Sequence, residues 1–298
     1  MTTNDKRPLL SYLKVQKQYE QRLLFTLRRT SSRINAQLKD LENRVGIGAA
    51  VRRDQLRMAQ AEIQREIGAL WRLMGSELEA ARADAASAAV KTMFVYDDML
   101  LRATMSAADR DYLMRSLVAQ ARGQVDVVQS RLLGYSRITL SDRVYKSQKL
   151  VSGQIDRLVD SALARGLSAR ELAAEVRSFI KPDVRGGVRY AAMRLGWTEL
   201  NNAFHATAVR HSATMPWVTG VQWHLSGSHP RPDECNDYAA HNGDGVWEPK
   251  DVPPKPHPNC LCYTTSVTVE RDEFISRYEA GEYDRYVDRM MAGETIRF

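Results

Sequence analysis

The sequence predicts a mainly α-helical protein with a small α+β domain at its C-terminal end. Apolar residues recur at helical spacing through most of the first 215 residues. After Pro216 the pattern changes to two short alternating segments around a loop rich in Pro, Cys and His. We therefore expect three consecutive parts: a basic long-helix arm over 1–105, a helical domain over 106–215, and a small α+β domain over 216–298 with a C-terminal helix.

The arm is expected to form an elongated helical hairpin. Over residues 9–45 apolar residues recur at steps of three, four and seven, and Gly46 and Gly48 end the pattern. A second helix is predicted over 52–85, extended by the Ala-rich run 80–90, with an apolar seam near heptad spacing. A Gly-containing turn between two long helices favours an antiparallel pair. A parallel coiled coil between protomers would need more heptads than this stretch contains.

Shorter helices with clear caps follow the arm. The run S-A-A-D at 106–109 begins a helix that reaches Gly134, and Ser141 begins another that ends near Gly166. The capping box S-A-R-E at 168–171 opens a helix that Pro182 closes. A last long helix is expected from Gly187 to about His211.

Two predicted strands, 217–225 and 261–269, flank the most unusual stretch of the chain. All three cysteines, four of the six histidines and seven of the ten prolines lie between Trp223 and Tyr263. Proline excludes long helix and central strand here, and few large apolar residues are available to pack the loop. A long loop in a compact domain needs another source of stability.

Thiols and imidazoles at both ends of this loop predict a structural zinc site. The expected ligands are Cys235, His257, Cys260 and Cys262, with His229 as a substitute, because zinc favours four sulfur or nitrogen ligands in a closed tetrahedron. Binding worth about 10–16 kcal/mol would offset the closure of such a loop. The alternatives are buried free thiols, or one disulfide with a spare cysteine.

Charge is divided unevenly along the chain. The net charge is +7, yet residues 220–298 hold 8 basic and 14 acidic residues. The N-terminal part is therefore the polycationic one, and DNA or an acidic protein surface is its expected partner, although each cation singly could be an ordinary solvated residue. The candidate contact residues share a place on or beside the two arm helices: Lys14, Lys17, Arg22, Arg28, Arg29, Arg33, Arg52, Arg53 and Arg57.

The sequence favours a protein without catalytic residues. A metal-dependent nuclease or a Cys/His nucleophile site could be built from His224, His229, Asp233 and Cys235, but three clustered thiols suit a closed structural site better. The sequence contains no P-loop, G-x-S-x-G or H-E-x-x-H motif. We expect Asp233 to orient the loop and Glu199 to be solvated or paired with a nearby base.

Nothing in the composition points to a membrane or to secretion. No run approaches eighteen apolar residues, and the first residues lack the apolar region of a signal peptide. Three clustered cysteines favour a reducing compartment over a disulfide scaffold. We therefore expect a soluble protein that is made in a cytoplasm.

The Cys/His stretch also carries a family resemblance. The runs W-H-L-S-G-S-H-P-R-P-D-E-C-N-D-Y and G-V-W-E-P-K-D-V-P-P-K-P-H-P-N-C-L-C-Y resemble the phage head-morphogenesis family, the Mu F-like minor head proteins of tailed phages. The helical segment W-T-E-L-N-N-A-F-H-A-T-A at 197–208 is similar to that family's T-E-x-x-x-A segment, with a tryptophan where many relatives have arginine. The motif positions are Trp197, Thr198, Glu199, Trp223, His229, Asp233 and Pro258.

The resemblance covers about residues 150–270 and implies a structural minor capsid protein of the virion. Such a protein would bind the phage portal protein and capsid or scaffold components, lie inside the capsid near the portal, and act in head assembly and in DNA packaging or ejection. Made in the host cytoplasm, it would need no membrane. The alternative is a zinc-stabilised nucleic-acid-binding protein or nuclease.

Overall fold

The computed structural model describes residues 5–43, 49–133, 140–165, 167, 169–180, 187–227, 232–258 and 260–294. Within these ranges the protein is mainly helical with one small antiparallel sheet, as the sequence predicts. The helices before the sheet are α1 (Arg7–Asn43), α2 (Ala49–Leu101), α3 (Ala107–Gly123), α4 (Val125–Leu133), α5 (Leu140–Ala164), α6 (Ala169–Ile180) and α7 (Val188–Thr214). The remaining elements are β1 (Val218–His224), α8 (Glu234–Ala239), the 3-10 helix η1 (His241–Gly243), β2 (Val246–Trp247), β3 (Tyr263–Thr268), α9 (Arg271–Glu279) and α10 (Asp284–Met291).

The chain forms two compact units, and each is built from segments that are far apart in sequence. Unit 1 comprises residues 1–16, 80–136 and 197–298, and unit 2 comprises 17–79 and 137–196. Helices α1, α2 and α7 give residues to both units. Each unit contains residues from more than one of the three parts that the sequence predicts, 1–105, 106–215 and 216–298. Whether these parts fold independently remains a prediction.

Unit 2 contains the antiparallel helix pair that the sequence predicts. Two ion pairs join α1 to α2, Arg22 with Glu77 at 3.6 Å and Arg33 with Glu66 at 3.8 Å. The residue number rises along α1 as it falls along α2, which defines an antiparallel pair. The apolar seam of both helices is buried, including Tyr19, Leu23, Leu27, Ile34, Leu56, Ile63, Ile67, Leu70, Met74 and Leu78. The turn glycines Gly46 and Gly48 lie outside the described residues.

Helix α5 packs on α2 in the same unit through polar and apolar contacts. The side-chain amides of Gln60 and Gln64 donate hydrogen bonds to Asp156 Oδ1, at 2.7 and 2.9 Å. On α5, Val151, Ile155 and Val159 are buried. Their i, i+4 spacing places them on one face, which is the face expected for a core helix.

The stretch 106–134 departs from the sequence prediction of a single helix. Ser106 caps α3 as expected, since its hydroxyl accepts a hydrogen bond from the Asp109 N–H at 3.1 Å. The helix ends at Gly123, where glycine favours termination, and α4 begins two residues later. The predicted capping serine Ser168 and the closing Pro182 lie outside the described residues.

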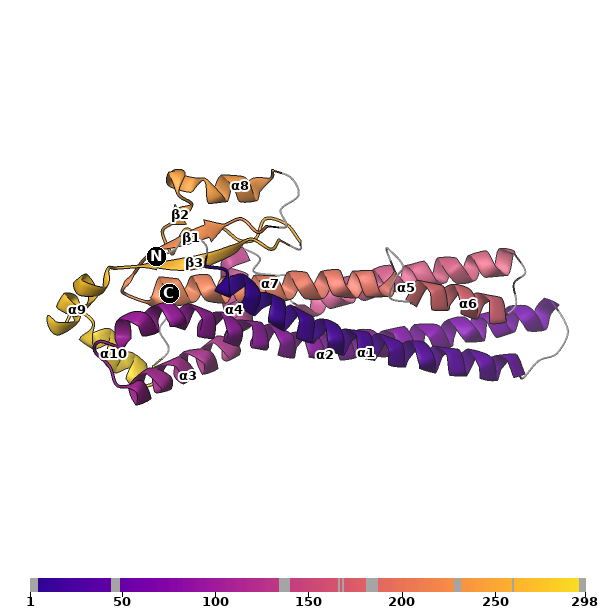
Figure 1. Cartoon of the computed structure of the whole chain (residues 1–298). Helices are drawn as coiled ribbons and strands as arrows, with labels where there is room; N and C mark the ends of the chain where they lie inside the picture. The colour runs from indigo at the N-terminus through magenta and orange to yellow at the C-terminus, as the bar shows by residue number, and fades with distance from the viewer. Residues whose placement is uncertain are drawn as a thin grey trace. The chain divides into compact units, whose positions relative to one another are not determined.

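The sheet of unit 1 has the strand order β2-β1-β3 and is antiparallel throughout. The two predicted strands are therefore confirmed as neighbours, with Val221 opposite both Ser266 on β3 and Trp247 on β2. The two-residue strand β2 was too short to predict from its pattern. In Figure 1 the sheet lies between α8 and α7, and a hydrogen bond of 2.8 Å between the Ser212 and Ser266 hydroxyls joins α7 to β3.

A buried aromatic and polar group ties α2 and α7 to the start of the sheet. The Trp217 indole N–H donates to Asp97 Oδ1 at 2.7 Å, and the other carboxylate oxygen lies 2.5 Å from His211 Nε2. The rings of Phe274 and Tyr283 pack edge-on against Trp217. The C-terminal helices α9 and α10 thus complete the core of unit 1.

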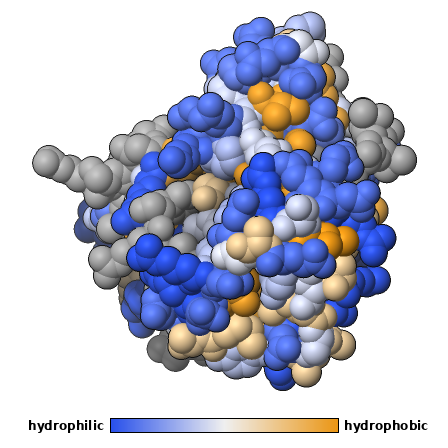
Figure 2. Space-filling model, turned by 90° about the vertical axis from the view of Figure 1, so that its left-hand side faces the viewer, coloured by the Kyte–Doolittle hydropathy of each residue, from blue (hydrophilic) through white to orange (hydrophobic). Residues whose placement is uncertain are grey.

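The exterior of the molecule is mostly polar on the face that Figure 2 shows. Hydrophilic residues dominate that face, and the hydrophobic ones among the coloured residues form small separate patches. Single apolar residues at a surface are normal and carry no functional implication. None of the helices in the described part of the chain combines the length and the apolar character that crossing a bilayer requires.

Candidate metal centre

The N-terminal turn of α8 positions the first cysteine of the centre. Asp233 caps this helix: its Oδ1 accepts the Cys235 N–H at 2.8 Å, and Asn236 Oδ1 accepts the Asp233 N–H at 3.0 Å. This reciprocal capping box fixes the backbone at the start of a very short helix. As a result the Cys235 side chain points inward and is fully buried.

Three of the predicted ligands meet at one point. The Cys235 sulfur lies 3.5 Å from the Cys260 sulfur and 3.7 Å from His257 Nε2. All three ligand atoms lie within 4.8 Å of one another. A zinc tetrahedron with metal–sulfur bonds of about 2.3 Å and metal–nitrogen bonds of about 2.0–2.1 Å would separate two sulfurs by about 3.8 Å and sulfur from nitrogen by about 3.6 Å. The group therefore has the spacing to hold a metal ion.

The surroundings of His257 suit the same role. Its Nδ1 lies 3.0 Å from the Pro258 carbonyl oxygen, and its Nε2 lies 3.0 Å from Asp233 Oδ2. The contact with Asp233 is a hydrogen bond when Nε2 carries a proton, and a metal at Nε2 would replace that proton, with the Nδ1 proton donated to the Pro258 carbonyl. Asp233 thus orients both Cys235 and His257, which is the role the sequence predicts for it.

Cys262, the fourth predicted ligand, is near the group but not part of it. It is buried and packs with Cys235, Cys260 and Trp223 in one cluster, whereas its sulfur is not among the three atoms within 4.8 Å of one another. Hydrogen bonds from the thiols of Cys235 and Cys260, together with the backbone of Ser226, lower the pKa of Cys262. The hydrogen bond to Cys260 conversely raises the pKa of Cys235. The three cysteines are free thiols.

The other histidines of the loop region are placed elsewhere or lie outside the description. His229, the substitute ligand, is not among the described residues. His224 Nε2 lies 2.8 Å from the Thr265 hydroxyl, and its ring stacks on Tyr263 at 4.9 Å. Burial lowers the pKa of His224. His241 stacks on Trp247 at 3.6 Å. Neither belongs to the three-ligand group.

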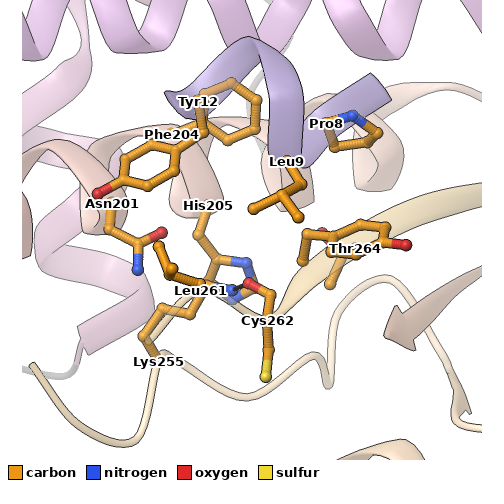
Figure 3. A pocket seen from close by; sticks show the side chains of 11 residues that line it. Pro8, Leu9, Tyr12, Asn201, Phe204, His205, Lys255, Leu261, Cys262 and Thr264 are labelled. Atoms are coloured by element: carbon orange, nitrogen blue, oxygen red, sulfur yellow. Dashed lines mark hydrogen bonds between the residues drawn. The ribbon is translucent and has the colours of Figure 1, made fainter. Parts of the chain in front are cut away.

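Helix α7 holds the loop that carries the second half of the centre, a role that sequence reasoning missed. The Asn201 side-chain amide donates to the Cys260 carbonyl oxygen, and His205 Nε2 lies 2.9 Å from the Pro253 carbonyl oxygen. Burial lowers the pKa of His205 to about 3, so the ring is neutral near pH 7. Figure 3 shows both side chains beside Lys255 and Cys262 in a pocket that Tyr12 and Phe204 close.

For Glu199, on the same helix, the sequence analysis expects either a solvated residue or one paired with a nearby base, and the structure has the second arrangement, with Arg82 as the base. It is buried, and its Oε2 accepts a hydrogen bond from Gln129 Nε2 at 3.2 Å. Arg82 Nε lies 3.8 Å from the same oxygen, and Arg82 Nη1 pairs with Asp126 at 2.7 Å. Glu199 is thus one member of a buried polar network that joins α2, α4 and α7.

The remaining motif positions have structural surroundings. The Trp197 carbonyl oxygen accepts a hydrogen bond from the Tyr12 hydroxyl at 3.2 Å. Trp223 is buried between His205 and Tyr238. Thr198 is half-buried on α7, and Pro258 is exposed beside His257.

Most of the predicted contact cations are accessible. Arg22 is half-buried and lies beside Glu77, and Arg33 is exposed near Glu66. Arg52 and Arg53 belong to α2, at positions whose side chains the structure does not describe. The others are exposed: Lys14, Lys17, Arg28, Arg29 and Arg57.

Charge also differs between the two units, although less than it differs between the two ends of the chain. Unit 2 contains 24 basic and 14 acidic residues, a net charge of +10, whereas unit 1 contains 19 basic and 22 acidic residues, a net charge of −3. The unit with the Cys/His group is therefore slightly acidic, and the other unit is the polycation.

The centre and this charge distribution are the features from which a function can be argued. Cys235, His257 and Cys260 form a group that can hold a metal ion. No protein-family model, no curated protein and no solved structure matches this chain.

Proposed function

We propose that Cys235, His257, Cys260 and Cys262 bind one structural zinc ion that staples the loop between β1 and β3. The supporting observation is the separation of 3.5 and 3.7 Å between the Cys235 sulfur and the other two ligand atoms, which matches a zinc tetrahedron. Cys262 is the natural fourth ligand, because it already packs against both cysteines. A closed site of this composition stabilises a fold and leaves no open position for chemistry.

Metal analysis tests this proposal directly. The purified chain should hold about one zinc per molecule, and chelation should make unit 1 sensitive to protease. Cys260→Ser should lose the zinc and destabilise the fold, whereas Thr219→Ser, at an exposed position of β1, should change neither property. If the chain holds no zinc and all three thiols react in the native state, the cysteines are free thiols and the proposal is wrong.

We further propose that the chain is a minor head protein of a tailed phage, bound to the portal inside the capsid. The resemblance motifs support this role, because the two segments that carry them are in contact: Asn201 and His205 of the helical segment hold the loop at Cys260 and Pro253. A non-enzymatic role agrees with a closed Cys/His centre. The protein would enter during head assembly and act in packaging or ejection of DNA.

Association with a portal ring tests this role. The full chain, expressed with the portal protein of the same phage, should purify with the ring and should be found inside assembled heads. Asn201→Ala, which removes the hydrogen bond to the loop, should weaken this association if the loop forms the contact, and Lys250→Ala, at an exposed site in the same unit, is the control. A chain absent from finished particles would contradict the proposal.

Unit 2 is proposed to contact DNA without reading its sequence. Its net charge of +10 and the exposed side chains of Arg28 and Arg29 support this. Affinity for duplex DNA should fall with salt, with a slope of about −0.9 for each phosphate neutralised. Reversing both charges with Arg28→Glu and Arg29→Glu should flatten that slope, and Lys250→Glu in unit 1 should not. If the chain does not bind duplex DNA even at low salt, the proposed contact with DNA is wrong, and an acidic protein surface becomes the expected partner of these cations.

The second candidate is a zinc-stabilised nucleic-acid-binding protein or nuclease, which the charge of unit 2 favours equally. Cleavage of plasmid DNA by the purified chain with added Mg²⁺ or Mn²⁺ separates the two candidates. The Asp233→Asn variant adds a control, since Asp233 Oδ2 is the carboxylate oxygen beside His257. Cleavage that this variant abolishes, in a folded protein, would place an enzyme first.

A further inference from the structure

Unit 2 exposes two aromatic side chains that its core does not use. Phe25 on α1 is 67% exposed and Tyr145 on α5 is 64% exposed, whereas Tyr19 and Trp71 of the same unit are buried. In the described part of the chain neither exposed ring packs against another ring or lies under a cation. Their faces are therefore open to a ligand.

Phe25 has an exposed apolar neighbour, Leu73, on the adjacent helix α2. Arg22 of α1 and Glu77 of α2 form an ion pair at 3.6 Å. Phe25 lies one turn after Arg22, and Leu73 lies one turn before Glu77, so each shares the side of its helix that carries the ion pair. Because the two helices are antiparallel, the turn after Arg22 lies beside the turn before Glu77. Leu73 is exposed and extends the apolar surface from α1 onto α2.

Tyr145 lies on the other side of the same part of α2. A Cβ atom at Gly75 would lie 3.7 Å from a Val144 methyl group, and one at Gly68 would lie 3.7 Å from Gln148 Nε2. The residue number rises along α5 as it falls along α2, so these helices are antiparallel as well. Tyr145 lies between the two α5 residues that make these contacts. It is therefore level with the stretch of α2 between the two glycines, which includes Leu73.

Exposed cations accompany this row of side chains on all three helices. Arg29 is four residues after the exposed ring of α1, and Lys149 is four residues after the exposed ring of α5, so each cation shares a helix side with its ring. Since α1 and α5 are both antiparallel to α2, they run in the same direction, and these two cations lie on the same side of the row. Arg72 is the exposed cation of α2 between them. We call the whole set the ring row: Phe25, Leu73 and Tyr145 with Arg29, Arg72 and Lys149.

We infer that the ring row binds single-stranded nucleic acid, with unpaired bases stacked on the two rings and phosphates beside the cations. This inference rests on the proposed contact of unit 2 with DNA and names the form of nucleic acid that it takes. A net charge of +10 suits a polyanion. Contacts to the phosphates of a duplex need no open rings, whereas stacking of bases on aromatic side chains is how proteins hold single strands. An acidic peptide helix would need a groove for its apolar face, but these exposed side chains project from their helices.

Binding of oligodeoxythymidine and of a duplex of equal length, at the same salt concentration, tests the inference in the full chain. Phe25→Leu and Tyr145→Leu keep an apolar side chain and remove the ring. Each should weaken binding of the single strand about 5-fold or more and leave the affinity for the duplex unchanged. Tyr145→Phe keeps the ring and should bind as the wild type does. Tyr112→Leu, at an exposed tyrosine of unit 1, is the matched control and should also bind as the wild type does.

The two ligands separate the failure of this inference from the failure of the proposed DNA contact. The double variant Arg28→Glu, Arg29→Glu should lose affinity for both ligands, because cations contact phosphates in each. If the wild type binds the duplex but both leucine variants bind the single strand as tightly as the wild type does, the inference is wrong and the DNA contact stands. Equal losses for the two ligands in the leucine variants would also overturn it. If the wild type binds neither ligand at low salt, the proposed DNA contact itself is wrong.

Discussion

At the scale of single residues, Gly196 is the position where the fold of unit 2 tolerates no side chain. A Cβ atom there would lie 2.7 Å from Cζ and 2.8 Å from the hydroxyl of Tyr19, whose ring is fully buried. Gly196→Ala should therefore lower the free energy of unfolding by about 1–3 kcal/mol, measured by urea denaturation. Gly153→Ala on α5 is the matched control, since its nearest neighbour lies at 3.9 Å. In the control, the higher helix propensity of alanine should raise the free energy of unfolding by about 0.5–1 kcal/mol. Equal effects at both sites would contradict the packing argument.

Glu199 is a second residue whose surroundings in the structure determine the expected effect of a mutation. A solvated glutamate would tolerate its amide, but this carboxylate is buried beside Gln129 and Arg82. Glu199→Gln should cost about 1–3 kcal/mol, less than the loss of a fully buried pair, because Arg82 retains Asp126. Asp126→Asn should cost under about 1 kcal/mol, since the Asp126 side chain is 82% exposed. Thermal unfolding measures the loss of stability in each variant. Similar losses in both would show that the buried hydrogen bonds of Glu199 do not stabilise the fold.

The sequence could predict the residues of the Cys/His group but not the residues that hold them in place. Cys235, His257 and Cys260 stand out because thiols and imidazoles are rare and here lie close together. Asn201 is 59 residues from the carbonyl it contacts, and an asparagine on a helix has no pattern that distinguishes it. Lys255, which donates a hydrogen bond to the Cys262 carbonyl oxygen, was equally hidden, since one lysine among prolines resembles any solvated loop residue. Only the packing of α7 against the loop reveals their roles.

At the scale of elements, the periodicity of the chain predicted most helices and both main strands. It succeeded where an apolar seam is long, as in α1 and α2, because many residues repeat the same signal. It failed at the break between α3 and α4, since one glycine is a weak signal inside an apolar run. Strand β2 could not be predicted because two residues carry no alternation, and its pairing with β1 depends on tertiary contacts.

The connection between the start of α1 and α2 depends on pH. Asp5 accepts hydrogen bonds from the side chain of Arg7 and, at 2.8 Å, from the Tyr96 hydroxyl of α2. The hydrogen bond from Arg7 is the main cause that lowers the pKa of Asp5 to about 2, below its usual value of 3.8. The folded state therefore favours the ionised form. This stabilisation is complete above about pH 4 and is lost as the pH falls towards 2.

Asp5→Asn should remove this dependence. The variant should be less stable than the wild type at pH 6, and its free energy of unfolding should fall less steeply between pH 4 and pH 2. Urea unfolding at several pH values measures both slopes. Protonation of the Cys/His group affects the two proteins alike, so the difference between them isolates Asp5. Parallel curves for the two proteins would show that the folded state does not favour the ionised form of Asp5.

At the scale of the whole molecule, the two units differ in composition in a way that suits a division of roles. Unit 1 holds the Cys/His group and a net charge of −3, and unit 2 holds a net charge of +10. A contact with DNA through unit 2 would leave the metal centre free to act as a staple. The sequence already indicated a basic N-terminal part, but the compact units were not predictable, because they depend on which distant segments pack together.

The same packing predicts the outcome of removing residues 1–85. Unit 1 includes residues from both ends of that segment: Tyr12 is buried, donates to the Trp197 carbonyl and packs edge-on against Phe204, while Arg82 enters the network of Glu199. Deletion would expose these surfaces, at a cost of about 3–5 kcal/mol for the loss of Tyr12 alone by analogy with other large aromatic truncations. We expect the remaining chain, residues 86–298, to be aggregated or protease-sensitive and to hold little zinc.

A milder variant separates the loss of packing from the loss of the long helices. Tyr12→Ala keeps the whole chain and should reproduce part of the defect, so that the protein loses zinc more readily during chelation. Lys14→Ala, at an exposed position two residues further along α1, should behave as the wild type. Limited proteolysis with zinc analysis measures both. A soluble, zinc-loaded fragment 86–298 would instead show that the C-terminal part folds without the arm. In that case the consecutive parts 1–105, 106–215 and 216–298 would describe the folding units better than the compact units do.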